Sequence, residues 1–530
     1  MYRHNGGDHV SRGWRFAFAA RGWGGGRTSV GRRLGSADRG LGALCRSESG
    51  DLAMLQIDGQ WREGSGEPFT SLNPATEQVV WKGNAANSAD VDDAFLAAVE
   101  AQIPWSALPW EERATSLRAF AGAVRANRDA MTQAISAEVG KPLWDAATEV
   151  DAVAAKIEVT INAQQRRRPE ETLDLNGRIG RTWYRPLGVV AVYGPFNFPA
   201  HIANGQIVPA LLAGNSVLFK PSELTPQVAE LTTKLWNEAG LPPGVFNLLQ
   251  GGAATGRLIA EHADLRGLFF TGSLTTGLKL RETLVHRPEV LLALELGGNN
   301  PLVVLEPDQN LSMLNQVIQS AFLTSGQRCT CVRRLILVGE SAAFLQQLQE
   351  KTSQIAVGAA DANPEPFMGP LIHAAAAERI LSQQQRLVAG GAVPILESRR
   401  MPSGPAFLSP GLIDVTTCGS RSDEEMFGPL LQVIRVDDFS AAIREANQTR
   451  FGLVAGLLGG GHDDFQRFRR QVNAGLVNWN LPTTGASGRL PFGGMGQSGN
   501  YRPAGYFATD FCNIPVAGLE PATPPERNDR

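Results

Sequence analysis

The amino-acid sequence predicts an α/β protein with two doubly wound lobes, each a mostly parallel sheet between layers of helices. Apolar runs of strand length alternate with helical patterns in two series, one before and one after Glu295. The chain of 530 residues also exceeds the length at which one hydrophobic core stops growing. In open α/β sheets ligands bind beyond the carboxyl ends of the strands, so residues that follow strand candidates are the first candidates for a site.

The elements follow one another in a regular order. Between residues 88 and 154, apolar side chains such as Val91, Phe95 and Ala98 recur at helical spacing. The first alternating series then has strands at residues 188–193, 216–219 and 245–249, with helices around residues 209–212 and at 227–239. The second series has strands at residues 301–305, 335–338 and 475–479.

Composition and charge exclude several classes of protein. A formal net charge of −3 gives no electrostatic reason to expect nucleic acid or an anionic membrane as a partner. The five cysteines are odd in number and unevenly spread, which favours a reducing compartment over a secreted disulfide framework. No apolar run approaches the ~20 residues that cross a bilayer. We therefore expect a soluble, cytoplasmic protein that binds small molecules, and we predict no metal site.

The two ends of the chain differ from the rest. Residues 1–53 are rich in Gly and Arg and lack Lys. Their Gly-rich stretch and weak helical periodicity argue against an organelle transit peptide. We expect either a disordered extension or translated sequence upstream of a start at Met54. Pro-rich and charged residues likewise predict a disordered tail over residues 516–530.

Cys329 is the first candidate for chemistry. In Ser325-Gly-Gln-Arg-Cys329 it follows a flexible glycine and polar residues, as an exposed nucleophile does. The thiolate is the reactive form, and positive charge or a helix N-terminus lowers the pKa of a thiol. Arg328 is adjacent in sequence. The alternative is an inert core cysteine.

Glu295 and Asn197 are the next candidates. Glu295 lies in Leu294-Glu-Leu-Gly-Gly-Asn-Asn-Pro301, where two glycines allow close approach of backbone or ligand and the carboxylate can act as a base. A solvated surface charge is the alternative. Asn197 lies in Tyr193-Gly-Pro-Phe-Asn-Phe-Pro199, between two aromatic residues and before Pro199, where by itself it can be a plain turn residue.

These motifs, in this order and spacing, resemble the aldehyde dehydrogenase superfamily from Met54 to about Pro515. The resemblance implies that Cys329 adds to an aldehyde carbonyl. Asn197 and the Cys329 N–H then stabilise the oxyanion, and Glu295 activates the water that releases a carboxylic acid. It also implies an NAD-binding domain, a catalytic domain, a small β oligomerisation element and a homodimer or dimer of dimers. We expect the NAD-binding domain at residues 54–165 and 188–296, the catalytic domain at residues 297–494, and the oligomerisation element at residues 166–187 and 495–515.

The resemblance further implies that NAD is the cofactor. Lys220 and Glu223, in Phe219-Lys-Pro-Ser-Glu223, would hold the adenosine ribose, and the carboxylate would repel the 2′-phosphate of NADP. Ser273 would cap a helix whose N-terminus holds the pyrophosphate, although the sequence lacks the common G-x-G-x-x-G fingerprint. Glu425 would hold the nicotinamide ribose, and Phe427 would pack against the nicotinamide. The remaining residues that we expect at the cofactor are Gly251, Gly256, Phe270 and Gly272.

Two further blocks, residues 326–334 and 499–512, resemble a branch of this family whose semialdehyde substrate carries two carboxylates. Arg328, Arg489 and Arg502 are candidate partners for those carboxylates, and Ser487 lies in a candidate substrate-anchoring segment. A broader semialdehyde dehydrogenase, acting on succinate or glutamate semialdehyde, is the alternative within the family. An enzyme that releases its thioester to CoA is disfavoured by Glu295, because such enzymes typically lack this carboxylate. A noncatalytic NAD-binding protein is disfavoured by the presence of Cys329, Glu295 and Asn197.

Overall fold

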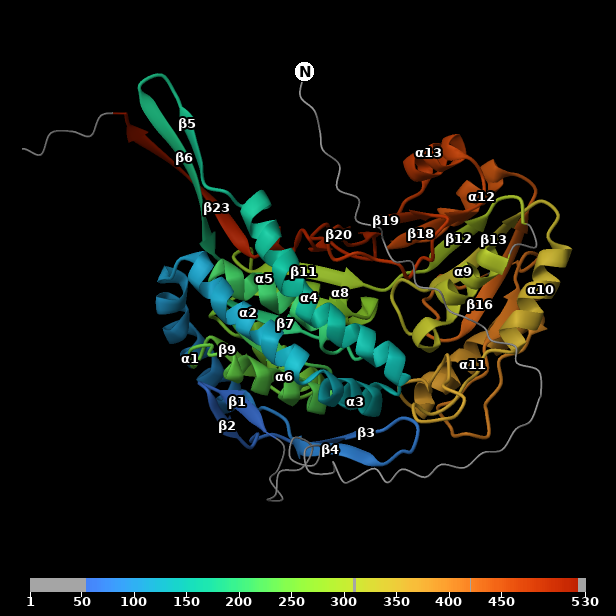
Figure 1. Cartoon of the computed structure of the whole chain (residues 1–530), viewed down its shortest axis with the longest axis horizontal. Coiled ribbons are helices and arrows are strands. Elements are labelled where there is room, and N and C mark those ends of the chain that lie inside the picture. Colours follow the sequence, from blue (N-terminus) through green and yellow to red (C-terminus); the bar gives the residue numbers. More distant parts are fainter. Residues whose placement is uncertain (1–53, 308–310, 420, 523–530) are drawn as a thin grey trace, which may run out of the picture. The chain divides into compact units, whose positions relative to one another are not determined.

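The computed structural model describes residues 54–307, 311–419 and 421–522. The expectations for residues 1–53 lie outside the described residues. The predicted helical entry region is confirmed as four successive helices: α1 (Ser88–Ala107), α2 (Trp110–Ala126), α3 (Arg128–Val139) and α4 (Leu143–Arg167). Helices α2, α3 and α4 pack into the core on one face of the sheet of the first lobe, whereas α1 packs mainly into the core on its other face (Figure 1). A hairpin of β3 (Pro68–Leu72) and β4 (Val79–Asn84) precedes them in the chain.

The first lobe contains a seven-stranded sheet in the order β11-β10-β7-β8-β9-β1-β2. Its strands from β11 to β9 are parallel, and β1 and β2 add an antiparallel edge. The strands are β1 (Leu55–Ile57), β2 (Gln60–Arg62), β7 (Val189–Tyr193), β8 (Ser216–Lys220), β9 (Phe246–Leu248), β10 (Leu265–Gly272) and β11 (Leu291–Leu296). The helices that connect them are α5 (His201–Ala213), α6 (Pro226–Glu238), α7 (Ala253–Glu261) and α8 (Leu274–Thr283).

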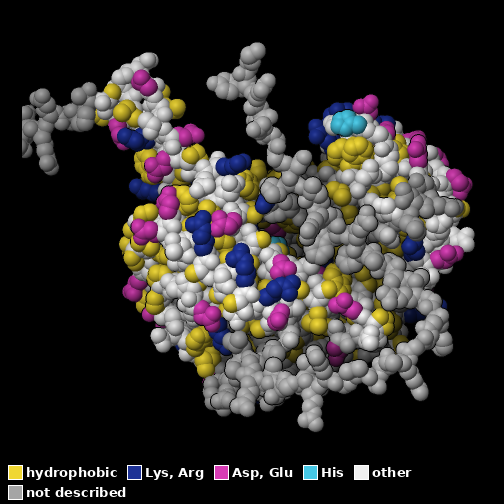
Figure 2. Space-filling model, viewed as in Figure 1, with side chains coloured by type: hydrophobic (Ala, Val, Ile, Leu, Met, Phe, Trp, Pro, Cys, Tyr) yellow, Lys and Arg dark blue, Asp and Glu magenta, His cyan; other side chains and the backbone are white. Residues whose placement is uncertain are grey.

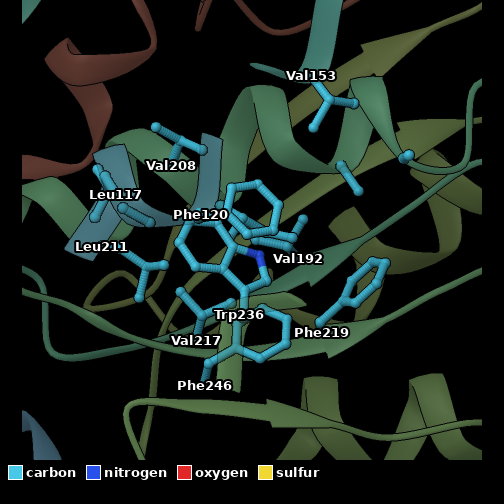
Figure 3. Close-up of a cluster of buried hydrophobic side chains, with 14 of the residues drawn as sticks. Leu117, Phe120, Val153, Val192, Val208, Leu211, Val217, Phe219, Trp236 and Phe246 are labelled. Atoms are coloured by element: carbon cyan, nitrogen blue, oxygen red, sulfur yellow. The ribbon is translucent and has the colours of Figure 1, made fainter. Parts of the chain in front are cut away.

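Both faces of this sheet are buried, because alternate residues of β7 and β8 enter opposite hydrophobic cores. On one face the ring of Phe120 stacks on Trp236 with centroids 3.6 Å apart, and Phe219 of β8 packs beside them (Figure 3). Leu218 points into the other core. Because β8 is packed on both faces, the position of its last residue, Lys220, is fixed.

The second lobe contains another seven-stranded sheet in the order β14-β15-β16-β13-β12-β18-β19. All neighbours in it are parallel except β14 and β15. Its strands are β12 (Asn300–Val304), β13 (Val332–Val338), β14 (Val393–Leu396), β15 (Gly411–Asp414), β16 (Leu430–Val436), β18 (Val454–Leu458) and β19 (Leu476–Trp479). Its helical segments are α9 (Leu311–Phe322), the 3₁₀ turn η1 (Leu323–Gly326), α10 (Ala342–Ser353), α11 (Ala374–Ala389), α12 (Phe439–Ala446) and α13 (His462–Gln471). The prediction of two α/β lobes is therefore confirmed.

A separate three-stranded sheet consists of β5 (Glu171–Asp174), β6 (Arg178–Pro186) and β23 (Asn513–Pro521), and it extends away from α4 (Figure 1). The prediction of a disordered tail is wrong for residues 516–521. β23 pairs with the whole length of β6, from Asn513 opposite Pro186 to Pro521 opposite Arg178. This ladder outweighs the local Pro and Gly content, which alone suggested disorder. Residues 523–530 lie outside the described residues.

The segment 495–512 does not join that sheet. In this segment, β21 (Met495–Gly496) pairs with β17 (Phe451–Gly452), and β22 (Ala504–Gly505) pairs with β20 (Pro491–Phe492). The short helix α14 (Ala508–Phe511) packs on α5. Only the strand that begins at Asn513 belongs to the projecting sheet.

The described surface carries mixed charge. On the helical face around α2 and α4, basic and acidic side chains are interspersed (Figure 2). None of the helices in the described ranges is long and apolar enough to cross a membrane.

Candidate active site

Glu295 lies near the carboxyl end of β11, where the chain passes from the first lobe to the second. It pairs with Thr271 of β10, and β12 begins only five residues later at Asn300. The side chain is buried, and its Oε2 has no hydrogen-bond partner among the described residues. Burial raises the pKa of Glu295 well above its ordinary value. A buried carboxyl with an unused oxygen is suited to accept a proton near neutral pH.

The turn before Cys329 has an unusual backbone. Thr324 and Ser325 adopt left-handed conformations with φ of 53° and 56°, and Gly326 follows with φ of 73°. Strain of this kind persists where neighbouring contacts hold it. The Thr324 hydroxyl donates to Asp145 Oδ2 at 2.6 Å, and the Ser325 hydroxyl donates to the Gly369 carbonyl at 2.7 Å. The backbone that presents the nucleophile is thus held from two sides.

Asn300 links the nucleophile to the Glu295 loop. Its side-chain amide donates to the carbonyls of Cys329 at 2.7 Å and of Cys331 at 2.8 Å, and its side-chain oxygen accepts from the N–H of Val454. Asn300 itself is buried at the start of β12. The Cys329 main chain is therefore fixed relative to the strand that follows Glu295.

Asn197 approaches the same turn from the first lobe. It is buried, and its side-chain amide donates to the Gln327 carbonyl at 2.9 Å. Gln327 is held in turn, because its side-chain oxygen accepts from the N–H of Ile372 at 2.9 Å. An amide has two N–H groups, so the other N–H of Asn197 can donate to a further acceptor.

The environment of Cys329 differs from the expectation of a thiolate favoured by a neighbouring cation. Burial, and then the carboxylates of Glu425 and Glu295, raise the pKa of Cys329 to about 12. Arg328 does not offset this, because its guanidinium pairs with the buried Asp145 at 2.8 Å. A raised pKa favours the thiol form, so attack of the sulfur on a carbonyl has to be coupled to loss of the proton.

The three arginines predicted to bind substrate carboxylates lie in different surroundings. Arg328 lies over the Phe198 ring at 4.9 Å, with its charge offset by Asp145. Arg502 is exposed and forms no ion pair with any residue that the structure describes. It lines a cavity of about 220 Å³ together with Glu295, and neither Cys329 nor Asn197 belongs to the lining of that cavity. Arg489 is exposed.

Ser487 and Arg489 lie on one exposed loop. The Arg489 N–H donates to the Ser487 hydroxyl at 3.3 Å, and both side chains are accessible. The structure brings Arg502 to the same cavity as Glu295, but no contact joins Ser487 or Arg489 to the Cys329 turn in the described residues.

Lys220 is the last residue of β8, and Glu223 follows three residues after the end of the strand. Lys220 is buried and Glu223 is exposed, with Nζ and Oε2 4.0 Å apart. Burial lowers the pKa of Lys220 from its usual range. Gly256 of α7 lies beside them, since a Cβ there would meet the Lys220 side chain at 3.3 Å, and its carbonyl accepts from the Tyr193 hydroxyl at 2.5 Å. The cation of Lys220 and the carboxylate of Glu223, near the carboxyl end of β8, are suited to bind the hydroxyls of a ribose.

The end of β10 and the start of α8 form the predicted helix N-terminus. The Ser273 hydroxyl accepts from the N–H of Thr276, which confirms the N-cap. Phe270 is buried and packs against Gly272, where a Cβ would lie 2.5 Å from its ring. Gly251 has φ of 145°, which a side chain rarely allows, and lies before α7.

Glu425 and Phe427 reach the site from the second lobe. A Cβ on Gly297 would lie only 1.9 Å from Glu425 Oε2, so the carboxylate packs directly on the loop after Glu295. Burial raises the pKa of Glu425 to about 7. Phe427 packs edge-on against Phe196, which precedes Asn197, with centroids 5.9 Å apart. This segment therefore touches the loops that carry both Glu295 and Asn197.

Three residues important to the site were missed in the sequence. Asn300 holds the nucleophile backbone, Asp145 pairs with Arg328, and Arg333 lies buried between Cys329 and Glu425. Asn300 lies in the same motif as Glu295, and this proximity in sequence is the signal that could have identified it. Asp145 and Arg333 lie in ordinary helix and strand patterns, with no local signal of a partner distant in the sequence.

Comparisons with known proteins agree with this geometry. Residues 61–515 match the aldehyde dehydrogenase family, and the chain belongs to that family. It is 50% identical over 469 residues to N-succinylglutamate 5-semialdehyde dehydrogenase of Pseudomonas fluorescens, covering 88% of this chain and 96% of that protein. A protein of the same name from Burkholderia multivorans is 48% identical over 89% of this chain and 97% of its own length.

Solved structures resemble the fold closely. An NADP-dependent enzyme of E. coli has a TM-score of 0.84 at 28% identity, covering 88% of this chain and 98% of that one. Betaine aldehyde dehydrogenase from Staphylococcus aureus in complex with NAD+ has a TM-score of 0.83 at 25% identity, covering 90% and 97%.

Proposed function

We propose that this chain oxidises N-succinyl-L-glutamate 5-semialdehyde to N-succinyl-L-glutamate with NAD, as a cytoplasmic step of arginine catabolism. The proposal is supported by the contact of Asn197 with the turn that carries Cys329 and by the carboxylate of Glu295, which is near enough for its charge to raise the pKa of Cys329. It is also supported by relatives of that name to which the chain is about half identical.

The chemistry proceeds through a thioester. The Cys329 sulfur adds to the aldehyde carbon as its proton passes to a water molecule, and the carbonyl oxygen takes up the electron pair of the broken π bond. The second N–H of the Asn197 amide and the Cys329 backbone N–H stabilise the oxyanion. Bound NAD would supply the hydride acceptor that lets this adduct go on to the thioester. Glu295 then takes a proton from water, which attacks the thioester and releases the carboxylic acid.

The residues present fit NAD. Lys220 and Glu223 would hold the adenosine ribose, and the N-terminus of α8 at Ser273 would hold the pyrophosphate. Glu425 has a buried Oε1 with no hydrogen-bond partner among the described residues, which is suited to accept from ribose hydroxyls. The relative in complex with NAD+ supports this choice, and the exposed carboxylate of Glu223 would repel the additional phosphate of NADP.

The substrate carries two carboxylates, which need cationic or N–H partners. We propose Arg502 as the first of these, because it shares a cavity with Glu295 and has no ion-pair partner in the described part of the chain. Arg489 and Ser487 are second candidates on their exposed loop. Arg328 is the weakest, because Asp145 already offsets its charge. Changing each arginine to lysine and finding an unchanged KM would remove that residue from the site.

The sheet of β5, β6 and β23 is proposed as the oligomerisation element of a homodimer or dimer of dimers. Leu173 and Leu519 on this sheet are more than half exposed. Light scattering of the purified protein should give a mass of two or four chains, whereas a monomer would contradict this part of the proposal.

The direct test is NADH formation from N-succinylglutamate semialdehyde by the purified chain. Succinate and glutamate semialdehydes at equal concentration identify the broader alternative, and NADP replaces NAD in a parallel assay. The proposal requires the highest kcat/KM with the succinylated substrate and NAD, and free acid as product. Equal rates on all three aldehydes, or an acyl-CoA product, would contradict it.

A further inference from the structure

Arg333 is fully buried between the nucleophile and the cofactor segment. It lies on β13, four residues after Cys329, and none of its surface is exposed. Removing a guanidinium from water is costly unless charge and hydrogen bonds offset the loss. A buried arginine next to a reactive centre therefore needs partners that account for its position.

The guanidinium of Arg333 contacts both the turn before Cys329 and the segment after Glu425. One terminal nitrogen donates to the Arg328 carbonyl, in the peptide that continues into Cys329, at 3.0 Å. The other donates to the Gly428 carbonyl at 3.4 Å, and the guanidinium lies 5.5 Å from the centre of the Phe427 ring. A single side chain thus contacts the nucleophile turn and the segment that follows Glu425.

The relation of Arg333 to Glu425 is electrostatic. Its terminal nitrogen is 3.7 Å from Glu425 Oε1, beyond hydrogen-bond length, and that oxygen has no other hydrogen-bond partner among the described residues. Burial raises the pKa of Glu425, and Arg333 acts in the opposite direction. The arginine therefore favours the carboxylate form while leaving Oε1 able to accept from a ligand.

We propose that Arg333 is a positioning residue that couples the Cys329 nucleophile to the carboxylate of Glu425, holding the nucleophile turn and keeping Glu425 charged for the cofactor. This rests on the roles proposed above for Cys329 and Glu425. Burial raises the pKa of Cys329 most, and the charge of Arg333 opposes that rise, so its removal makes the thiolate harder to form.

The next residue supplies a matched control. Arg334 is also buried on β13, but its guanidinium donates to the carbonyls of Asn299, Glu445 and Ala446. It also pairs with Glu445 at 3.5 Å. An Arg334→Lys variant perturbs a buried guanidinium on the same strand without touching Glu425 or the Arg328 carbonyl.

The test uses Arg333→Lys, Arg333→Met and Arg334→Lys in the full chain. The alkylation rate of Cys329 by iodoacetamide is followed against pH by peptide mass spectrometry, NAD affinity is measured by calorimetry, and Tm reports folding. Neither of the first two readouts requires turnover, so both remain valid if the proposed reaction is wrong.

In Arg333→Met we expect the alkylation profile to move to higher pH and the Kd for NAD to rise roughly tenfold. Arg333→Lys should show smaller changes in the same directions, and it keeps the test usable if the methionine variant does not fold. Arg334→Lys should change Tm alone. Unchanged profiles and affinity in a folded Arg333 variant, a change in only one of them, or equal changes in Arg334→Lys would overturn the proposal.

Discussion

Replacing Gly297 with alanine tests whether the Glu425 carboxylate is held where a cofactor needs it. A Cβ at this position would lie 1.9 Å from Oε2 and 2.7 Å from the carboxyl carbon of Glu425. Ordinary contacts are ~3.4 Å or longer, so the carboxylate has to move by more than about 1 Å. Hydrogen bonds to a charged group contribute about 1.5–3 kcal/mol, and the Kd for NAD should therefore rise roughly 10–100-fold.

Calorimetric titration with NAD provides the measurement, and a double-mutant cycle provides the assignment. Gly297→Ala and Glu425→Ala should each weaken NAD binding, but Gly297→Ala should add less than about twofold once the carboxylate is absent. Gly122→Ala on α2 is the control, because no atom lies within 4 Å of its added Cβ. Unchanged affinity in Gly297→Ala, or the same loss with and without Glu425, would refute this reasoning.

Three further predictions concern the chemical steps and the cofactor. Asn197→Ala should lower kcat by ~100–1000-fold in steady-state assays, whereas a loss below about tenfold would exclude it as an oxyanion donor. Because burial raises the pKa of Glu295, the base form is gained only as pH rises, so hydrolysis should increase with pH and reach half its maximum well above pH 4.5; a Glu295→Gln variant should lose this dependence. Glu223→Gln should raise kcat/KM with NADP relative to NAD, and an unchanged ratio would remove this carboxylate from cofactor selection.

The sequence predicted the fold well where local pattern decides structure. The strands near residues 188–193, 216–219 and 245–249 are present, and each is a short apolar run that is buried as expected for a strand inside a parallel sheet. The prediction of disorder failed at residues 516–521, where pairing with a strand more than 300 residues away in the sequence decides the conformation. Long-range pairing leaves little trace in a single sequence.

The same contrast applies to the site. The motifs around Cys329 and Glu295 were found because several blocks occur together in one order. The partner of Arg328 could not be found in this way, because Asp145 lies on α4 and precedes Arg328 by 183 residues. The raised pKa of Cys329 also could not be predicted, because it depends on burial and on carboxylates that only the fold brings near.

The central claim is that Cys329 carries the thioester and Glu295 supplies the base that resolves it. The most direct measurement is rapid-mixing NADH formation by Glu295→Gln with N-succinylglutamate semialdehyde, followed by mass spectrometry of the quenched enzyme. The account predicts a burst of roughly one NADH per chain, slow turnover afterwards, and an acyl adduct on Cys329. Steady turnover at the unmodified rate without a burst, or an adduct on another residue, would contradict it.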